Sequence, residues 1–124
     1  MINYKTISRA LAEIGQDQKP LIISEYGAGA IYNLHDPMHP RWSEEYQSDC
    51  LEAITSYLLE PDVAAGFFIW QFCDTKVSWD IKGQRQRPGC RNNKGLVDEY
   101  RRPKMAYYTV QKLLKNFDRK ENLL

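Results

Sequence analysis

Residues 19–27 hold the feature that most constrains the fold, a short apolar strand that ends in a carboxylate. Three branched apolar residues at 21–23 follow a proline and lead directly into Ser-Glu-Tyr-Gly. Such a run without polar alternation predicts a strand over 21–26 that is covered on both faces, as in a parallel sheet with helical crossovers. In α/β barrels, residues at the carboxyl ends of strands line the active-site face. Glu25 is therefore either an active-site carboxylate or a glutamate that enters solvent where the strand ends.

A second apolar stretch, residues 63–72, predicts a strand that pairs with the first. Residues 42–59, which lie between the two strands, show helical periodicity, and Ser43 suits the N-cap. The expected buried stripe of this helix consists of Tyr46, Cys50, Leu51, Ile54, Tyr57 and Leu58. Strand, helix and strand in this order predict a βαβ unit with a right-handed crossover.

Two further helices are predicted, over residues 3–15 and after Pro103, which suits a first helical turn. The expected buried face of the last helix consists of Ala106, Val110, Leu113, Leu114 and Phe117. The fold class is therefore α/β, with parallel strands and helical crossovers. Because two strands leave both edges of a sheet open, we expect residues 1–124 to form a single incomplete domain that pairs with another chain.

Residues 75–102 form a long irregular segment, and loops of this length in compact domains are usually functional. Between Lys82 and Lys104 there are eight basic and two acidic residues, which fits a solvated loop or a pocket for an anion. A nucleic-acid site is disfavoured, because Tyr100 is the only aromatic residue there and base stacking needs several. The net charge of +1 also provides no field that would recruit nucleic acid or a membrane.

His35 and His39 are four residues apart, a spacing that suits a metal ion only on a helix. Pro37 and Pro40 argue against a helix, so we expect no metal at the two histidines. We also expect no other cofactor. The three cysteines form no C-x-x-C pair, which disfavours a zinc site or a disulfide framework. With no apolar run of about 20 residues and no signal-peptide core, we expect a cytoplasmic location.

Five motifs, in the same order, resemble the end of the catalytic domain of glycoside hydrolase family 2, and within it the β-glucuronidase branch. They are KPLIISEYG, RWSEEYQ, GFFIWQFCD, RNNKG and RRPKMAYYTVQKLL, within residues 19–114. The resemblance implies a partial TIM barrel that comprises the last two βα units and a preceding helix, the C-terminal quarter of a glycosidase domain. It also implies a glucuronide-type sugar as substrate, with galacturonides open as an alternative.

The resemblance implies roles for individual residues by position. Glu25 matches the nucleophile of retaining β-glucuronidases, and Trp70 matches an aromatic residue at the floor of the sugar site. Asn92 and Lys94 match the N-x-K pair that binds the sugar carboxylate, which an amide and a positive charge suit chemically. Tyr26 is expected to border the nucleophile and to donate its hydroxyl to it.

Two features depart from the family pattern. Retaining glycosidases need a second carboxyl group about 5 Å from the nucleophile, and the family takes it from an Asn-Glu pair that this sequence lacks. Residues 76–91 do not align with the family, so Arg85, Arg87 and Arg91 stay open as further carboxylate ligands.

Two hypotheses follow from the sequence. In the first, the chain is the C-terminal barrel portion of a retaining β-glucuronidase, and it carries the nucleophile but not the acid/base. In the second, it is a catalytically inactive barrel fragment that self-associates as a homo-oligomer. Under both hypotheses, we expect the chain alone to have little or no hydrolase activity.

Overall fold

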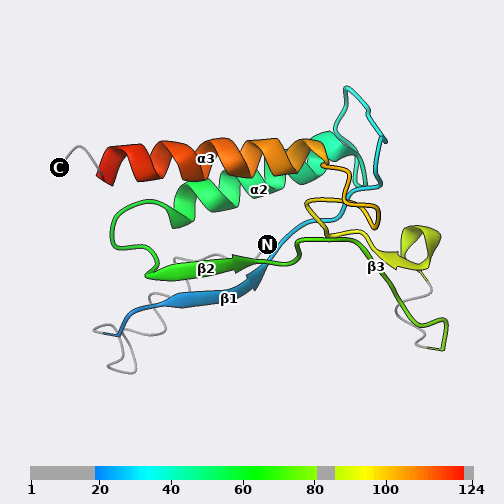
Figure 1. Cartoon of the computed structure of the whole chain (residues 1–124), viewed down its shortest axis with the longest axis horizontal. Coiled ribbons are helices and arrows are strands. Elements are labelled where there is room, and N and C mark those ends of the chain that lie inside the picture. Colours follow the sequence, from blue (N-terminus) through cyan, green and yellow to red (C-terminus); the bar gives the residue numbers. More distant parts are fainter. Residues whose placement is uncertain (1–18, 81–85, 122–124) are drawn as a thin grey trace.

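The computed structural model describes residues 19–80 and 86–121, and the helix predicted over 3–15 lies outside them. The main elements are β1 (Ile22–Tyr26), α2 (Glu44–Leu58), β2 (Gly66–Ile69), β3 (Thr75–Lys76), a 3-10 turn (Pro88–Cys90), β4 (Arg91–Asn92) and α3 (Met105–Glu121). Figure 1 shows α2 and α3 side by side over one face of the β1–β2 sheet. No helix of the described residues is long and apolar enough to cross a membrane.

β1 and β2 are parallel neighbours, which confirms the predicted α/β class with parallel strands and helices. Ile22 pairs with Gly66 and Tyr26 pairs with Ile69, with an irregularity in the register between Ile23 and Tyr26. The second strand covers Gly66–Ile69 and is shorter than the predicted 63–72. Its four residues lie beside the five of β1, its neighbour within the described residues, and a strand is hydrogen-bonded only as far as its neighbour extends.

The core lies between the sheet and the two helices. It consists of Tyr26, Leu51, Leu58, Ala106 and Val110. Side chains that point away from the helices lie on the opposite face of the sheet. Ile22 and Phe68 lie there, with 57% and 64% of their surface exposed. The expectation that both faces of the first strand are covered is therefore met on one face only.

Only two of the six residues in the predicted buried stripe of α2, Leu51 and Leu58, are fully buried. Ser43 caps the helix as expected, since its Oγ accepts a hydrogen bond from the Tyr46 N–H at 3.1 Å. Tyr46, Cys50, Ile54 and Tyr57, however, are only half-buried, although Ile54 and Tyr57 pack against the core. The buried row is Glu44, Gln47, Ser48, Leu51, Thr55 and Leu58. Four of these six side chains are polar, so an apolar pattern could not reveal the row.

Internal hydrogen bonds allow these polar side chains of α2 to be buried. Ser48 Oγ lies 2.7 Å from Thr109 Oγ1 of α3, so one of the two hydroxyls donates to the other. The Glu44 carboxylate accepts from the Asn33 N–H at 2.6 Å and from the Met105 N–H, the first of α3, at 2.5 Å. The positive end of the α3 dipole also stabilises a carboxylate at this position.

The last helix differs from its prediction at both its start and its apolar face. Pro103 lies before the helix, in a bridge with Val97, and not in the first turn. Ala106 and Val110 are buried as predicted, whereas Leu114 is exposed. Leu113 and Phe117, before and after it in the sequence, are half-buried. The covered face of α3 therefore follows Ala106, Val110, Leu113 and Phe117, and Leu114 lies outside it. Figure 1 also shows that α3 extends past the end of α2.

The residue after β1 must be glycine on steric grounds. The Trp70 N–H donates to the Tyr26 carbonyl at 2.7 Å, which brings the ends of β1 and β2 together. A Cβ at Gly27 would lie 2.1 Å from the Trp70 carbonyl oxygen. Only a residue without a side chain therefore allows this close approach.

We expect Gly27→Ala to destabilise the fold. The added Cβ would force the two strand ends apart, which should lower the free energy of unfolding by roughly 2 kcal/mol or more. Gly66→Ala on β2 is the matched control, since no heavy atom lies within 4 Å of its added Cβ, and its effect should stay within about 1 kcal/mol. Urea denaturation measures both variants, and equal stability of the two would contradict the argument.

Candidate functional site

Glu25 and Trp70 lie at the same end of the sheet, where β1 and β2 reach their carboxyl ends. Glu25 is exposed one residue before the end of β1, and Trp70 directly follows β2 with 43% of its surface exposed. The hydrogen bond between the Trp70 N–H and the Tyr26 carbonyl keeps these two strand ends adjacent. The parallel pairing thus brings together two of the residues that the sequence singled out.

The segment that carries the N-x-K pair is attached to this end of the sheet through its backbone. The Gln71 N–H donates to the Lys94 carbonyl, and the Leu96 N–H donates to the Gln71 carbonyl, both at 3.0 Å. The Ala30 N–H donates to the Asn93 carbonyl at 2.9 Å. Asn92 and Lys94 therefore sit beside the residues that follow β2 and the loop that follows β1.

Asn92 and Lys94 line an open pocket of about 660 Å³. The other lining residues are Gly27, Ala28, Gly29, Arg41, Trp42, Tyr46, Cys50, Ile54, Gln86, Arg87 and Asn93. Gly27 directly follows β1, so the pocket opens next to the strand end that carries Glu25. Glu25 and Trp70 are at the same end of the sheet but are not part of this lining.

The three arginines that the sequence left open have different surroundings. Arg87 lines the pocket together with Lys94. Arg91 forms an ion pair with Glu99 at 2.7 Å and donates to the Gly89 carbonyl at 3.2 Å. Arg85 lies outside the described residues. Of the two arginines that the structure describes, Arg87 is the one that shares a pocket with the N-x-K pair.

Sequence reasoning missed the α2 side of the pocket. Arg41 lies over the ring of Trp42, with 4.8 Å from its guanidinium carbon to the ring centroid, and both residues line the pocket. Tyr46 and Cys50 were assigned to the core from their four-residue spacing, but they also face the pocket. The four-residue spacing correctly indicated residues on one face of α2. It could not indicate whether that face packs against the core or lines a pocket.

Tyr26 does not have the predicted position. Its ring is buried in the core, edge-on to Phe67, and its hydroxyl lies 2.8 Å from Thr55 Oγ1 of α2. The register irregularity between Ile23 and Tyr26 interrupts the regular alternation of side chains, so that Ser24 and Glu25 are both exposed while Tyr26 packs toward α2. The expectation that Tyr26 borders the site is therefore corrected, and the residue belongs to the core.

A buried lysine joins the loops around the site, and in the sequence it is marked only as one more basic residue. Lys104 has no exposed surface, and its Nζ donates to the carbonyls of Ala30 and Asn93 at 2.6 and 3.1 Å. It also forms an ion pair with the Asp74 carboxylate, with Nζ 2.9 Å from Oδ1 and 2.8 Å from Oδ2. Burial raises the pKa of Asp74, and the hydrogen bond and charge of Lys104 oppose this increase.

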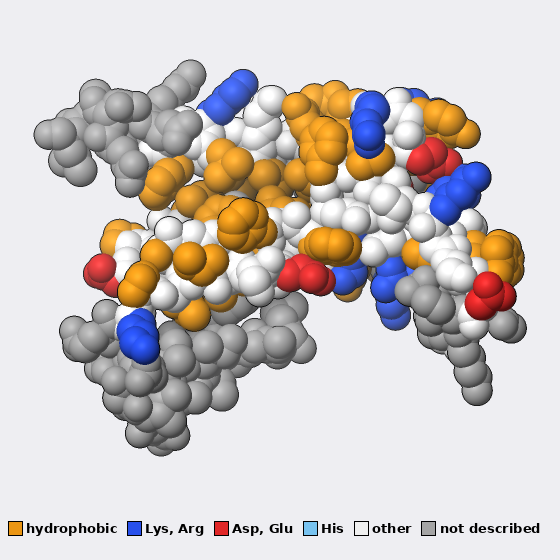
Figure 2. All heavy atoms as spheres, turned by 60° about the horizontal axis from the view of Figure 1, so that its bottom comes forward, with side chains coloured by type: hydrophobic (Ala, Val, Ile, Leu, Met, Phe, Trp, Pro, Cys, Tyr) orange, Lys and Arg blue, Asp and Glu red, His pale blue; other side chains and the backbone are white. Residues whose placement is uncertain are grey.

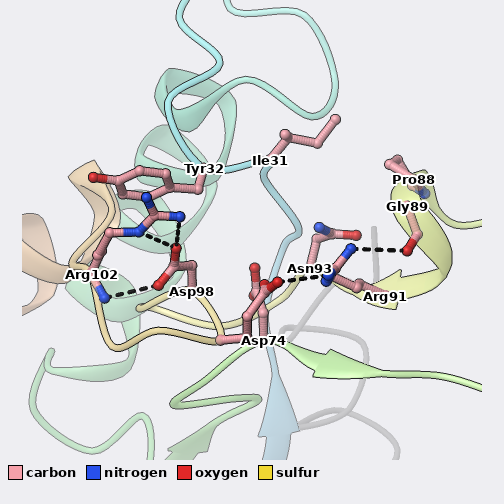
Figure 3. Close-up of a pocket in the computed structure, with 10 residues that line it drawn as sticks. Ile31, Tyr32, Asp74, Pro88, Gly89, Arg91, Asn93, Asp98 and Arg102 are labelled. Atoms are coloured by element: carbon pink, nitrogen blue, oxygen red, sulfur yellow. Dashed lines mark hydrogen bonds and ion pairs between the residues drawn. The ribbon is translucent and has the colours of Figure 1, made fainter.

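A second, smaller pocket of about 210 Å³ has Asp74 and Asn93 among its lining residues (Figure 3). Four of its charged residues form the ion pairs Arg91–Glu99 and Arg102–Asp98, and Asp74 binds Lys104. The Asp98 carboxylate accepts from the Arg102 side chain, with Nε at 2.6 Å, and the Arg102 guanidinium lies over the Tyr32 ring at 4.1 Å. These contacts fix the loop over residues 98–102 and point to a structural role for this pocket.

The two histidines bind carboxylates of α2. His35 Nδ1 lies 2.7 Å from Glu45 Oε1, and His39 Nδ1 lies 2.5 Å from Asp49 Oδ2. The hydrogen bond to Glu45 raises the pKa of His35, and the bond to Asp49 raises that of His39. Across residues 19–80 and 86–121 there is no group of three or more potential metal ligands.

Comparisons with known proteins gave two kinds of similarity, although no family model matches the chain. The chain is 36% identical over 96 residues to the β-glucuronidase of Rattus norvegicus, and 33% identical over 88 residues to that of Paenibacillus borealis. These alignments cover 76% and 71% of this chain. The chain spans only 14% of the length of either relative.

Among solved structures, the chain is similar to a family 2 β-galacturonidase from Eisenbergiella tayi bound to galacturonate. The TM-score is 0.82 at 40% identity, over 90% of this chain and 20% of that one. A β-D-glucuronidase structure from Dictyoglomus thermophilum gives a TM-score of 0.66 at 30% identity, over 90% of this chain and 19% of that one.

We expect both histidines to titrate above the ordinary value of 6.5. Because each pKa is raised in the folded state, the stabilisation from these pairs is fully present below pH 6.5 and is lost as the pH rises through the raised value. Nuclear magnetic resonance titration of the imidazole signals measures both values. Glu45→Gln should return the pKa of His35 toward 6.5 and leave that of His39 raised, because Asp49 is its main partner. An unchanged His35 in this variant would contradict the assignment.

Proposed function

Since this chain is a β-glucuronidase-like portion of glycoside hydrolase family 2, we propose that it provides the nucleophile and the carboxylate-binding residues of a retaining uronide hydrolase. The relatives named above are glycoside hydrolases, and one was solved with galacturonate. The observation that carries the proposal is the attachment of the N-x-K segment to the ends of β1 and β2. This attachment places a cationic and an amide side chain in one pocket, next to the strand that carries Glu25.

The proposed architecture is the last two βα units of a TIM barrel. β1 with α2 forms one unit, and β2 with α3 forms the second, with the loops of residues 70–104 inserted between strand and helix. The parallel pairing of β1 and β2 supports this arrangement, because barrel strands are all parallel. In this proposal the remaining strands pair with the two outer edges of the sheet.

Glu25 is the proposed nucleophile. It would attack the anomeric carbon of the sugar while the bond to the aglycone oxygen breaks, and water would later hydrolyse the covalent glycosyl-enzyme. Its exposed position near the carboxyl end of β1 supports this role, since substrates reach barrel active sites at that end of the strands. Trp70, half-exposed at the end of the neighbouring strand, is the proposed floor of the sugar site.

Asn92 and Lys94 are the proposed ligands of the sugar carboxylate. The Lys94 ammonium would form a charge-assisted hydrogen bond with it, and the Asn92 amide would donate a second one. Arg87 in the same pocket adds positive charge. An uncharged sugar offers no acceptor of equal strength, so the site would discriminate in favour of uronides.

The alternative, an inactive fragment that self-associates, is supported by a different observation. Ile22, Phe68 and Phe72 are large hydrophobic residues with more than half of their surface exposed. Figure 2 shows hydrophobic side chains gathered on the face of the molecule below the sheet of Figure 1. An exposed apolar sheet face with open edges favours association, with a second copy or with further barrel strands.

We expect the chain alone to show no turnover of aryl glucuronides that depends on Glu25. A missing acid/base carboxyl group forgoes a factor of about 10² to 10⁴ in rate. The assay is run on size-exclusion fractions with light scattering, and Glu25→Gln is the matched variant. Turnover that follows the protein peak and disappears in Glu25→Gln would contradict the expectation.

A concentration-dependent increase in molar mass, measured on the same fractions, would favour the self-associating alternative.

We expect the chain to bind glucuronate more tightly than glucose, and Lys94→Met to reduce this preference about tenfold or more. The reason is the loss of a charge-assisted hydrogen bond, which contributes roughly 1.5–3 kcal/mol. Lys112→Met, an exposed lysine on α3, is the matched control. Chemical-shift titration at constant ionic strength gives the affinities, and a preference that survives in Lys94→Met would reject the assigned role.

A further inference from the structure

We propose that Lys104 is a positioning residue for the N-x-K pair. Its buried ammonium fixes the backbone on both sides of Lys94, so that the side chains of Asn92 and Lys94 keep the geometry needed to bind a sugar carboxylate. Lys104 has no exposed surface, so it cannot contact the sugar itself. The inference rests on the proposed function and extends it to a residue outside the pocket lining.

The three N–H donors of Lys104 have three partners, one in each of three loops. They are the Ala30 carbonyl in the loop after β1, the Asp74 carboxylate after β2, and the Asn93 carbonyl in the N-x-K segment. An ammonium group has three donors and no acceptor, so its hydrogen-bonding capacity is fully used. One side chain thus fixes the relative positions of all three loops.

The contacts enclose Lys94 from both directions along the chain. The preceding Asn93 carbonyl accepts from Lys104 Nζ, and the following Gly95 N–H donates to Asp74 Oδ1 at 2.8 Å. The Lys94 carbonyl itself accepts from the Gln71 N–H. Three consecutive residues are therefore held through their backbones, and the Lys94 side chain remains available to the pocket.

Gly95 completes this arrangement by steric fit. A Cβ at this position would lie 2.3 Å from the Asp74 N and 2.5 Å from Asp74 Oδ1. The segment therefore packs against Asp74 as closely as a backbone allows. Any displacement of the Asp74 carboxylate must move Gly95, and with it the preceding Lys94.

Stability alone does not account for a buried ion pair. Desolvation of the two charges offsets most of their attraction, and apolar residues of similar volume often stabilise a fold as well or better. Apolar residues, however, provide no directed donors for the Ala30 and Asn93 carbonyls. The Lys104–Asp74 pair is therefore better explained by the geometry that it imposes on the loops.

The test compares the wild-type chain with the double variant Asp74→Asn/Lys104→Met. Lys104→Met alone leaves Asp74 buried without its cation and is expected to unfold part of the chain. The double variant removes both charges and keeps an oxygen at position 74 for the Gly95 N–H. Lys112→Met is the control for removal of a lysine from the protein. Two quantities are measured: the affinity ratio of glucuronate to glucose, and hydrogen exchange of individual backbone amides.

We expect the double variant to lose about tenfold in its preference for glucuronate, the effect of misplacing one charge-assisted hydrogen bond. The Ala30 and Gly95 amides should exchange faster, while the amides of α2 and α3 keep their protection. A double variant with unchanged preference would overturn the inference, whatever its Gly95 exchange. Equal loss of protection throughout α2 and α3 would also overturn it, because the pair would then support the whole fold.

The same experiment separates the inference from the function on which it rests. A wild-type chain without preference for glucuronate over glucose rejects the proposed function, and the positioning role with it. A wild-type chain with the preference, together with a double variant that keeps it, rejects only the positioning role.

Discussion

The buried ammonium of Lys104 is the interaction on which the arrangement of the loops depends. The β1–β2 sheet and its two helices form a core of five apolar residues, which fixes the strands but not the segments that follow them. Those segments bury the apolar side chains of Ala30, Cys90 and Val97, and their backbone groups are held by hydrogen bonds as well. Lys104 connects three of them, and the Gln47 amide connects two by donating to the Ala28 and Gly95 carbonyls at 2.9 and 3.0 Å.

These polar contacts follow from the position of the loops between the ends of the helices. α2 and α3 begin near the carboxyl ends of β1 and β2 (Figure 1). The first turns of both helices therefore face backbone groups of the loops, and polar side chains there meet N–H and C=O partners. Glu44 and Lys104, one at each helix start, bind loop atoms on this side. Leu58 and Val110, farther along the helices, pack in the apolar core.

The sequence was informative where the structure depends on local patterns. The first strand and the helix after it were predicted to within two residues, because branched apolar runs, an N-cap serine and helical spacing are local signals. The side on which α2 is buried was not predictable, since Gln47 and Thr55 are polar and become buried only through distant partners. The partners of Lys104 are 11 to 74 residues away in sequence, and no spacing rule connects them.

Many carboxylates of the described residues already bind other groups, which bears on where the second carboxyl group of the proposed site comes from. Glycoside hydrolysis with retention requires a second carboxyl group beside the nucleophile, free to give and take a proton. The buried carboxylates of Glu44, Asp74 and Asp98 each accept internal hydrogen bonds, and those of Glu45 and Asp49 bind the two histidines. A group committed to such bonds would have to break them to protonate a leaving group. Under the proposed function, the described residues provide the nucleophile and the uronate-binding pair, and the acid is then expected from further barrel strands at the open edges of the sheet.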